Sequence, residues 1–506
     1  MTVGKASSTG PVERLFLLSL ILVATAIWTV RLTSSSFWID EQIAAEIAAS
    51  DGADDVWRQV LQRERRPPGY HLLLYATRLA LGDSDYGLRF PSLASGILAM
   101  CVTARLTREL SGRRAMQVAV ALIVTSPFLA LYVPMARYYS LVWLLTASAW
   151  LLLRRWAHGS VPAAYGYAAC MATLCYTDPA IIPVATGHAL YIWARHRHIT
   201  RRWGLLIAGI ALLFVPWLRN VLIQSQRDLI RSDLSQGAVG MALRLAAPLY
   251  VWTVGEATFP WEPAAWLGLL AGLALSLAML HRRDVLKGVG LSVVIPLGFT
   301  AILVGAIAPD ITFLNVASRS LYAAPALYAC WGTLIGSRPT LGRRLALAAI
   351  LTSNVIGMAY ALSATHLLNP IYAVPAREIA LTVTKEAEPG DLFLAPADSV
   401  VERYWPDNAA VPLLESRSAE ARTAAAQAEG RVWLLTLGRD RTRARAALDV
   451  IKTLEARCRV VRQEGYAPID PTYQRVREIA LRHPSYSFKA TLTLYECPGG
   501  ADADRP

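Results

Sequence analysis

An acidic pair, Asp40-Glu41, follows the first long apolar run of the chain. The apolar residues three, four and seven positions beyond Asp40 predict a short amphipathic helix that lies on a membrane surface. Asp40 then falls at the N-cap of this helix, and Asp is a preferred capping residue. A carboxylate pair at this position can also act as a general base or bind a metal ion. The residue types therefore leave a capping role and a chemical role open.

Three arginines beside two prolines and a glycine can bind phosphate. They are Arg63, Arg65 and Arg66, just before Pro67-Pro68-Gly69 in the segment between the first two apolar runs. A guanidinium group binds phosphate oxygens through paired hydrogen bonds. The alternative is that these side chains extend to the lipid head groups while their stems stay in the apolar layer. Residue type alone does not decide between the two.

Three further acidic residues, Glu64, Asp178 and Glu256, also lie near predicted membrane boundaries and can line a polar cavity. Asp178 precedes a proline, and this pair of residues also favours a turn. Histidines outside the apolar runs are few and lack the His-x-x-x-His spacing of a zinc site, so zinc catalysis is not expected. A requirement for another divalent cation stays open.

Composition indicates which elements position these residues. Of the 506 residues, 54% are hydrophobic and 17% are charged, whereas a soluble domain has about 25% charged residues. A polytopic membrane protein is therefore expected, since about 20 apolar residues are enough to cross a bilayer core. We predict about eleven transmembrane spans, at residues 15–30, 88–104, 115–133, 138–153, 161–176, 179–194, 203–219, 264–281, 288–308, 319–336 and 344–363.

Basic residues mark every second end of these predicted spans. Short loops rich in arginine follow spans two, four, six, eight and ten, which predicts that these loops and the N-terminus face the cytoplasm. The formal net charge of +13 then reflects membrane topology, and no nucleic-acid partner is expected. Three long segments fall on the opposite side of the membrane, namely residues 31–87, 220–263 and 364–506.

The C-terminal segment 364–506 differs in pattern from the membrane part, residues 1–363. Helical and extended stretches alternate along it, which predicts a small extracytoplasmic α/β domain. The expected helices are 378–386, 400–405 and 441–456, and the expected strands are 391–395, 431–437, 458–462 and 490–496. Cys458 and Cys497 each stand beside an expected strand, and outside the cytoplasm they can form a disulfide or remain thiols. The predicted fold is an all-α polytopic membrane domain with this small α/β domain attached.

The order of short motifs along residues 15–365 resembles that of a known family. After the first span comes Asp-Glu, followed by Pro-Pro-x-Tyr, Gly-Asp-Ser-x-x-x-Leu-Arg-x-Pro, Ala-Arg-x-Tyr-Ser-Leu, Tyr-Thr-Asp, and an Arg before a Pro. This order resembles the GT-C glycosyltransferases that use polyprenyl-phosphate sugars. Relatives in that family include the protein O-mannosyltransferases, the lipid A aminoarabinose transferase and rhizobial lipopolysaccharide core transferases.

The resemblance implies a role for each matching residue. Asp40 matches the catalytic base, which accepts the proton of the acceptor hydroxyl, and Glu41 is its partner in the motif. Arg66 matches a residue that contacts the donor phosphate, and Arg137 and Arg319 are further candidates for that contact. The aminoarabinose transferase pattern has Glu-Lys before its prolines; this chain has Arg65-Arg66 there, with Glu64 one place earlier, so an aminoarabinose donor is not expected.

The resemblance also implies an activity and a place in the cell. We expect an integral enzyme of the bacterial cytoplasmic membrane that moves a monosaccharide from a polyprenyl-phosphate donor to a lipid, polysaccharide or protein outside. Some members use a divalent cation and others do not.

A transporter or lipid-linked sugar flippase is the main alternative, and it would need ionisable groups inside the spans. A non-catalytic scaffold is a second alternative, and it would tolerate the loss of the Asp40 carboxylate.

Overall fold

The computed structural model describes residues 11–64, 66–225, 237–282, 318–337, 340–363, 366–438, 441–481 and 487–498, together with residues 290 and 298. The chain divides into two compact units. The first comprises Met1–Leu32 and Ala44–Leu362, and the second comprises Thr33–Ile43 and Ser363–Pro506. The short segment that carries Asp40 and Glu41 therefore belongs to the same unit as the C-terminal residues.

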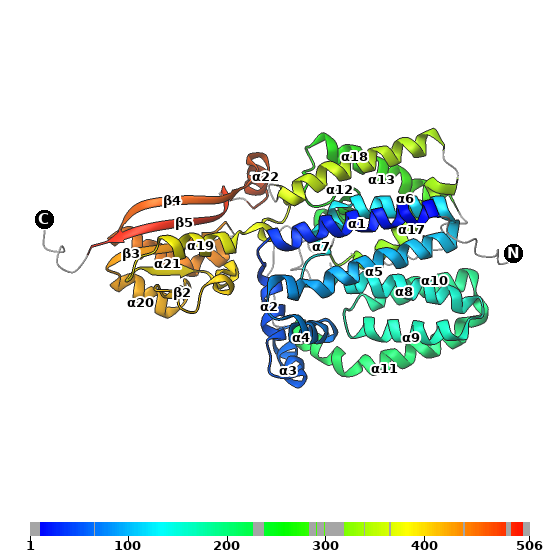
Figure 1. The fold of residues 1–506 in the computed structure, drawn as a ribbon, viewed down its shortest axis with the longest axis horizontal. Helices are drawn as coiled ribbons and strands as arrows, with labels where there is room; N and C mark the ends of the chain where they lie inside the picture. Colours follow the sequence, from blue (N-terminus) through cyan, green and yellow to red (C-terminus); the bar gives the residue numbers. More distant parts are fainter. Residues whose placement is uncertain are drawn as a thin grey trace. The chain divides into compact units, whose positions relative to one another are not determined.

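The first unit is built from helices in its described part (Figure 1). Their bounds are α1 (Pro11–Ser34), α3 (Ala53–Arg63), α4 (Gly69–Leu81), α5 (Asp85–Ser111), α6 (Arg113–Thr125), α7 (Pro127–Tyr132), α8 (Tyr139–Ala157), α9 (Val161–Cys175), α10 (Ile181–Arg195), α11 (Thr200–Ser225), α12 (Gly237–Val254), α13 (Pro263–His281), α17 (Ala324–Ser337) and α18 (Leu341–Ser363). Helix α2 (Ile39–Ala48) begins in the second unit and ends in the first.

Five helices in the described residues are long and apolar enough to cross a membrane. They are Leu15–Leu32, Asp85–Ser111, Arg197–Trp217, Pro263–His281 and Leu341–Ser363. Helices α8, α9, α10 and α17 also cover predicted spans, but they do not meet the same length and hydropathy requirements. The total of eleven spans stays a prediction, because most of the run at 288–308 lies outside the described residues.

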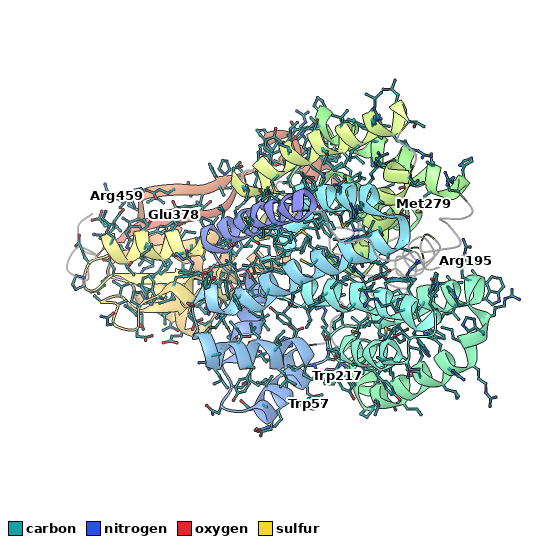
Figure 2. All side chains as sticks on the ribbon, turned by 45° about the vertical axis from the view of Figure 1, so that its right-hand side comes forward. Trp57, Arg195, Trp217, Met279, Glu378 and Arg459 are labelled. Carbon is teal, nitrogen blue, oxygen red and sulfur yellow. A yellow bond between two sulfur atoms is a disulfide. The ribbon has the colours of Figure 1, made fainter. Side chains whose placement is uncertain are left out.

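The two ends of the helical unit differ in the residues that they carry. Figure 2 shows Arg195 and Met279, near the ends of α10 and α13, at one end of the bundle. Trp57 and Trp217 lie toward the other end, where their rings meet edge to face with centroids 5.7 Å apart. This contact joins α3, in the segment after the first span, to α11.

One predicted span is interrupted. The run at 115–133 was expected to form a single helix, but α6 ends at Thr125 and α7 begins at Pro127. The hydroxyl oxygen of Ser126 accepts a hydrogen bond from the N–H of Leu129, as an N-cap does, and proline suits the first helical position. The expectation of a continuous helix was therefore wrong at this Ser-Pro pair.

The segment 220–263, expected as an outer loop, contains helix α12. Gly255 follows it with φ +83°, a left-handed conformation that favours glycine. A Cβ at this position would lie 2.5 Å from Cγ of Pro127 in α7. The tight turn at Gly255 therefore brings the next residue, Glu256, against α7.

The second unit contains a five-stranded mixed sheet with the strand order β2-β1-β3-β5-β4. Strands β1 and β2 are parallel, as are β1 and β3, whereas β5 runs antiparallel to both β3 and β4. The strand bounds are β1 (Leu392–Ala395), β2 (Leu413–Glu415), β3 (Gly430–Leu437), β4 (Arg459–Pro468) and β5 (Phe488–Cys497).

Helices α19 (Ala376–Glu386), α20 (Ala419–Gln427), α21 (Arg441–Arg457) and α22 (Pro471–Leu481) complete this unit. Side chains of α20 and α21 share one apolar core with strands β1, β3 and β5, which includes Leu394, Ala421, Ala425, Val432, Leu434, Val450, Leu454 and Tyr495. The structure also joins Cys458 to Cys497 by a disulfide, the pairing that the sequence left open. A helical membrane part with a small α/β C-terminal part is thus confirmed.

Candidate functional site

Asp40 and Glu41 occupy the first turn of α2. The helix begins at Ile39, so Asp40 lies inside it and the expectation that Asp40 is the N-cap was wrong. The cap is formed instead by Glu41, whose Oε2 accepts a hydrogen bond from the backbone N–H of Trp38 at 3.4 Å. A carboxylate that reaches back to this N–H is one half of a capping box. Glu41 is therefore a buried residue that holds this turn, while Asp40 is partly exposed.

In the first unit, the buried carboxylate of Glu64 pairs with the buried guanidinium of Arg137. Nη1 of Arg137 lies 2.9 Å from Oε1 of Glu64, and Nε2 of His71 lies 3.7 Å from the same oxygen. Burial by itself raises the pKa of the Glu64 carboxyl, but Arg137, His71 and Arg66 outweigh it and hold that pKa well below its ordinary value. Glu64 is therefore a charged carboxylate at neutral pH.

Arg66 and Asp178 form a second ion pair beside the first. Nε of Arg66 lies 3.1 Å from Oδ2 of Asp178, and the Arg66 guanidinium lies 4.3 Å from the centre of the Tyr138 ring. The other carboxylate oxygen of Asp178 accepts a hydrogen bond from the N–H of Ala180, which holds the turn expected from its Asp-Pro sequence. Asp178 thus combines the turn role with an electrostatic role.

A close backbone contact brings these two ion pairs together. The N–H of Gly69, at the start of α4, donates a hydrogen bond to the carbonyl oxygen of Tyr176 at 2.7 Å. A Cβ on residue 69 would lie 2.5 Å from that same oxygen, so glycine is required for the approach. The segment that carries Arg66 is thereby held against the segment that carries Asp178.

Arg319 is the third guanidinium of the cluster. Arg66, Tyr138 and Asp178 are near enough to act electrostatically on its charge. Its Nε is buried and has no hydrogen-bond partner among the described residues. The hydroxyl of Tyr138 is likewise buried without a partner among those residues. Unused buried donors are rare in proteins, because leaving them unpaired costs free energy.

The charges in this cluster, defined by Glu64, Arg66, Arg137, Asp178 and Arg319, do not balance. Three guanidinium groups face two carboxylates, and each carboxylate already pairs with an arginine other than Arg319. A buried charge without a partner is strongly unfavourable. The arrangement is therefore suited to an anion that supplies the missing negative charge and accepts hydrogen bonds from Arg319.

Glu256 lies apart from the ion pairs but is linked to them through tyrosine rings. Its Oε1 accepts a 2.7 Å hydrogen bond from the hydroxyl of Tyr132, and its Oε2 has no partner among the described residues. The ring of Tyr132 meets that of Tyr139, which in turn lies against Tyr138, the ring beneath Arg66. Burial raises the pKa of Glu256 to about 8, so it is a neutral acid at neutral pH.

The sequence identified most of these residues but not their partners. It singled out all five members of the charged cluster, yet it gave no reason to pair Glu64 with Arg137 or Arg66 with Asp178. The roles of His71 and Tyr138 were missed, although Tyr138 stands inside the Ala-Arg-x-Tyr-Ser-Leu motif and His71 directly follows Pro-Pro-x-Tyr. Among the described residues, no three His, Cys, Asp or Glu side chains come together as metal ligands would, so we assign no residue to a metal.

Part of the chain matches a known protein family. Residues 65–219 match the sequence profile of the dolichyl-phosphate-mannose-protein mannosyltransferase family. This segment contains Arg66, Arg137 and Asp178. No curated protein sequence matches the chain.

The fold is that of a solved structure, ArnT from Cupriavidus metallidurans in its apo state. The two share 16% sequence identity with a TM-score of 0.51, over 95% of this chain and 98% of ArnT. Also similar are ArnT bound to undecaprenyl phosphate (TM-score 0.46, 14% identity, 94% of this chain and 97% of that one) and the mycobacterial arabinofuranosyltransferase AftD (TM-score 0.42, 16% identity, 98% of this chain and 40% of that one). The match over residues 65–219 confirms the expected resemblance to the GT-C glycosyltransferases. The five long apolar helices indicate a membrane protein.

The ion pair between Glu64 and Arg137 predicts that Glu64→Gln lowers the Tm strongly and in a pH-dependent way. The substitution removes the negative charge that faces the buried Arg137, and breaking a buried ion pair costs about 3–5 kcal/mol. We expect the Tm of the full chain in detergent to fall by several degrees at neutral pH. The loss should shrink as the pH falls through the lowered folded-state pKa of Glu64, because the wild-type carboxylate is then protonated as well. The matched control is Glu46→Gln, which breaks the exposed pair with Arg63 and should change the Tm little. Equal effects of the two substitutions would contradict the assignment.

The raised pKa of Glu256 predicts a contribution to stability that is lost at high pH, whereas the contribution of Glu64 is lost at low pH. An unfolded glutamate has a pKa of about 4.3, so the neutral Glu256 stabilises the fold most at low pH. This contribution is lost as the pH rises toward the folded-state pKa of about 8. Glu256→Gln keeps the shape and stays neutral. We therefore expect the Tm of the wild type to fall relative to this variant between about pH 5 and pH 9. If the Tm of the wild type and of Glu256→Gln change in parallel over this pH range, Glu256 is ionised throughout it and its pKa is not raised.

Proposed function

We propose that the chain is a membrane glycosyltransferase that takes one monosaccharide from a polyprenyl-phosphate donor and transfers it to an acceptor outside the cytoplasmic membrane. The observation that carries the proposal is the excess positive charge of Arg66, Arg137 and Arg319 over Glu64 and Asp178 in one buried cluster. The phosphate of a lipid-linked sugar is an anion that must lie at the membrane boundary. The match to the mannosyltransferase family over residues 65–219, which contain Arg66, Arg137 and Asp178, supports this choice of anion.

In the proposed reaction, the carboxylate of Asp40 accepts the proton of an acceptor hydroxyl group. The acceptor oxygen bonds to the anomeric carbon of the sugar, and the bond from that carbon to the phosphate oxygen breaks. Polyprenyl phosphate leaves with one more negative charge than it had in the donor. Fixed positive groups stabilise such charge as it develops in the transition state. Arg319 is assigned the most direct contact because it does not pair with either carboxylate of the cluster.

Glu41 has a positioning role in this proposal. Its hydrogen bond to Trp38 fixes the first turn of α2, and that turn carries Asp40. Glu64 and Asp178 likewise orient Arg137 and Arg66. Glu256, neutral and hydrogen-bonded to Tyr132, is a cavity acid that adds no negative charge beside the donor phosphate.

We place the protein in the bacterial cytoplasmic membrane with a cytoplasmic N-terminus and an external C-terminal unit. The arginine-rich loops that follow alternate predicted spans support this orientation. The disulfide between Cys458 and Cys497 also supports it, because disulfides persist in oxidising compartments outside the cytoplasm.

The role of Asp40 is tested by mass spectrometry of envelope lipids, glycans and glycoproteins. The strains are the wild type, a deletion, and the deletion complemented with Asp40→Asn. We expect one sugar mass to disappear in the deletion and Asp40→Asn not to restore it, since loss of a general base slows a reaction by about 10²–10⁴-fold. The control is Asp54→Asn, which alters an exposed carboxylate of α3 and should restore the product. Full restoration by Asp40→Asn would contradict the proposal and favour a transporter or a scaffold.

The role of Arg319 is tested with purified protein and undecaprenyl phosphate. A hydrogen bond to a charged group contributes about 1.5–3 kcal/mol, so Arg319→Gln is expected to raise the Kd by about 10- to 100-fold. The control is Arg201→Gln, which alters an exposed arginine at the start of α11 and should leave the Kd within about twofold. Unchanged binding by Arg319→Gln would place the phosphate elsewhere.

A further inference from the structure

A groove in the C-terminal unit has the position and size of a small-molecule site. It lies beside the edge strand β2 and at the carboxyl end of the parallel strand β1, and its volume is about 430 Å³. Ligands of α/β sheets commonly bind beyond the carboxyl ends of parallel strands. Small-molecule sites have volumes of about 300–1,000 Å³, so the groove can hold a short oligosaccharide.

The lining of the groove is acidic and aromatic. The lining includes the acidic residues Glu402, Asp407 and Glu415, together with Trp405 and Ser399. The lining includes no lysine or arginine. A groove of this charge repels phosphates and other anions. Within the described residues, its carboxylates do not come together as the three ligands of a metal site.

The walls of the groove are held in place by contacts among their own residues. The hydroxyl of Ser399 donates a hydrogen bond to the carbonyl oxygen of Pro396, and the carboxylate of Glu415 accepts one from the N–H of Arg417. Asp398 pairs with Arg417 at 2.9 Å, which ties the segment after β1 to the segment after β2. Trp405 packs against Phe393 of β1 with ring centroids 5.0 Å apart. Glu402 and Asp407 are exposed, and their carboxylates accept no hydrogen bond from the described residues.

The backbone that carries this lining is strained at one residue. Val400 has φ +62°, a left-handed conformation that is unusual for a β-branched residue. It separates the short 3₁₀ turn Ala397–Ser399 from the next, Val401–Tyr404. The second of these turns supplies Glu402 and leads directly into Trp405. Backbone strain of this kind is often retained at binding sites.

The same turn also contacts the segment that carries Asp40, within one unit. The hydroxyl oxygen of Tyr404 accepts a hydrogen bond from the N–H of Phe37 at 2.8 Å, and the guanidinium of Arg403 lies 4.3 Å from the centre of the Phe37 ring. Glu402 and Trp405 thus line the groove, while their chain neighbours Arg403 and Tyr404 hold Phe37, just before α2. A ligand in the groove would therefore contact the same short turn, Val401–Tyr404, that holds Phe37 and the segment leading to Asp40.

We propose that this groove binds a neutral oligosaccharide, and that the acceptor of the transferase is therefore a glycan. Carboxylates accept hydrogen bonds from sugar hydroxyl groups, and an aromatic ring packs against the apolar face of a sugar ring. The part of the proposal that concerns the acceptor rests on the function proposed above. Binding in the groove does not rest on it.

Binding is tested with the full-length protein in phospholipid nanodiscs, since many detergents carry sugar head groups. Calorimetric titration with mannotriose, maltotriose and chitotriose should show that at least one of them binds. Glu402→Gln and Asp407→Asn alter exposed side chains, and each should raise the Kd by about tenfold.

Trp405→Phe keeps the contact with Phe393 and should raise the Kd less than the two carboxylate substitutions do. The control is Glu420→Gln, an exposed carboxylate of α20 outside the lining, which should leave the Kd within about twofold. If none of the three sugars binds, or if every variant binds them with the Kd of the wild type, the proposal that the groove binds an oligosaccharide is overturned.

The strains used for Asp40 separate this inference from the proposed function. If a trisaccharide binds but the deletion loses no sugar mass, the transferase proposal is wrong and the binding proposal for the groove is supported. If the deletion loses a sugar mass but no trisaccharide binds, the transferase proposal is supported and the binding proposal is wrong.

If both proposals are supported, Glu402→Gln and Asp407→Asn should lower the amount of product and raise the KM for a glycan acceptor, with kcat within about twofold. An unchanged KM would overturn the link between the groove and the acceptor.

Discussion

The ion pair between Arg137 and Glu64 makes it possible to bury a cluster of arginines in a helical unit of low charge. Removing a charged side chain from water costs several kcal/mol unless a partner of opposite charge compensates. Glu64 compensates Arg137 at 2.9 Å, and Asp178 compensates Arg66 at 3.1 Å. Each pair joins two segments that are far apart in the sequence, so these bonds also determine how the segment after the first span is held. The positive charge of Arg319 is then left for a bound anion to compensate, because each of the two carboxylates already pairs with another arginine.

The fold could be predicted wherever a long segment repeats one pattern. Helix α21 and strands β3 and β5 were expected within a few residues of their bounds, because each has a consistent apolar periodicity. Strand β2 was missed because three residues are too few to show alternation, and α20 was missed because its alanine-rich sequence has almost no apolar face. The break between α6 and α7 was missed although Ser126 and Pro127 signal it, since the run around them is uniformly apolar.

The candidate site could be predicted by residue type but not by geometry. Charged residues at the ends of apolar runs are few, which is why Glu64, Arg66, Arg137, Asp178 and Arg319 were all singled out. Their pairing depends on contacts between residues 73 and 112 positions apart in the chain, and no local pattern encodes such contacts. The cap formed by Glu41 was assigned to Asp40 because the helix begins at Ile39, before the acidic pair. The groove beside β2 was not foreseen, since it depends on a strand that the sequence did not reveal.

The place of β5 in its sheet has a consequence for how the protein is made. β5 is the last of the five strands in the sequence, yet it lies between β3 and β4 and pairs with both. On a ribosome, β3 and β4 are therefore complete well before the strand that joins them exists. The sheet cannot close during the synthesis of its first four strands, and the disulfide of Cys458 cannot form until Cys497 has been made. The sheet therefore matures only after all the helices of the first unit have been synthesised, and a nascent chain interrupted before residue 488 would leave strand edges unpaired.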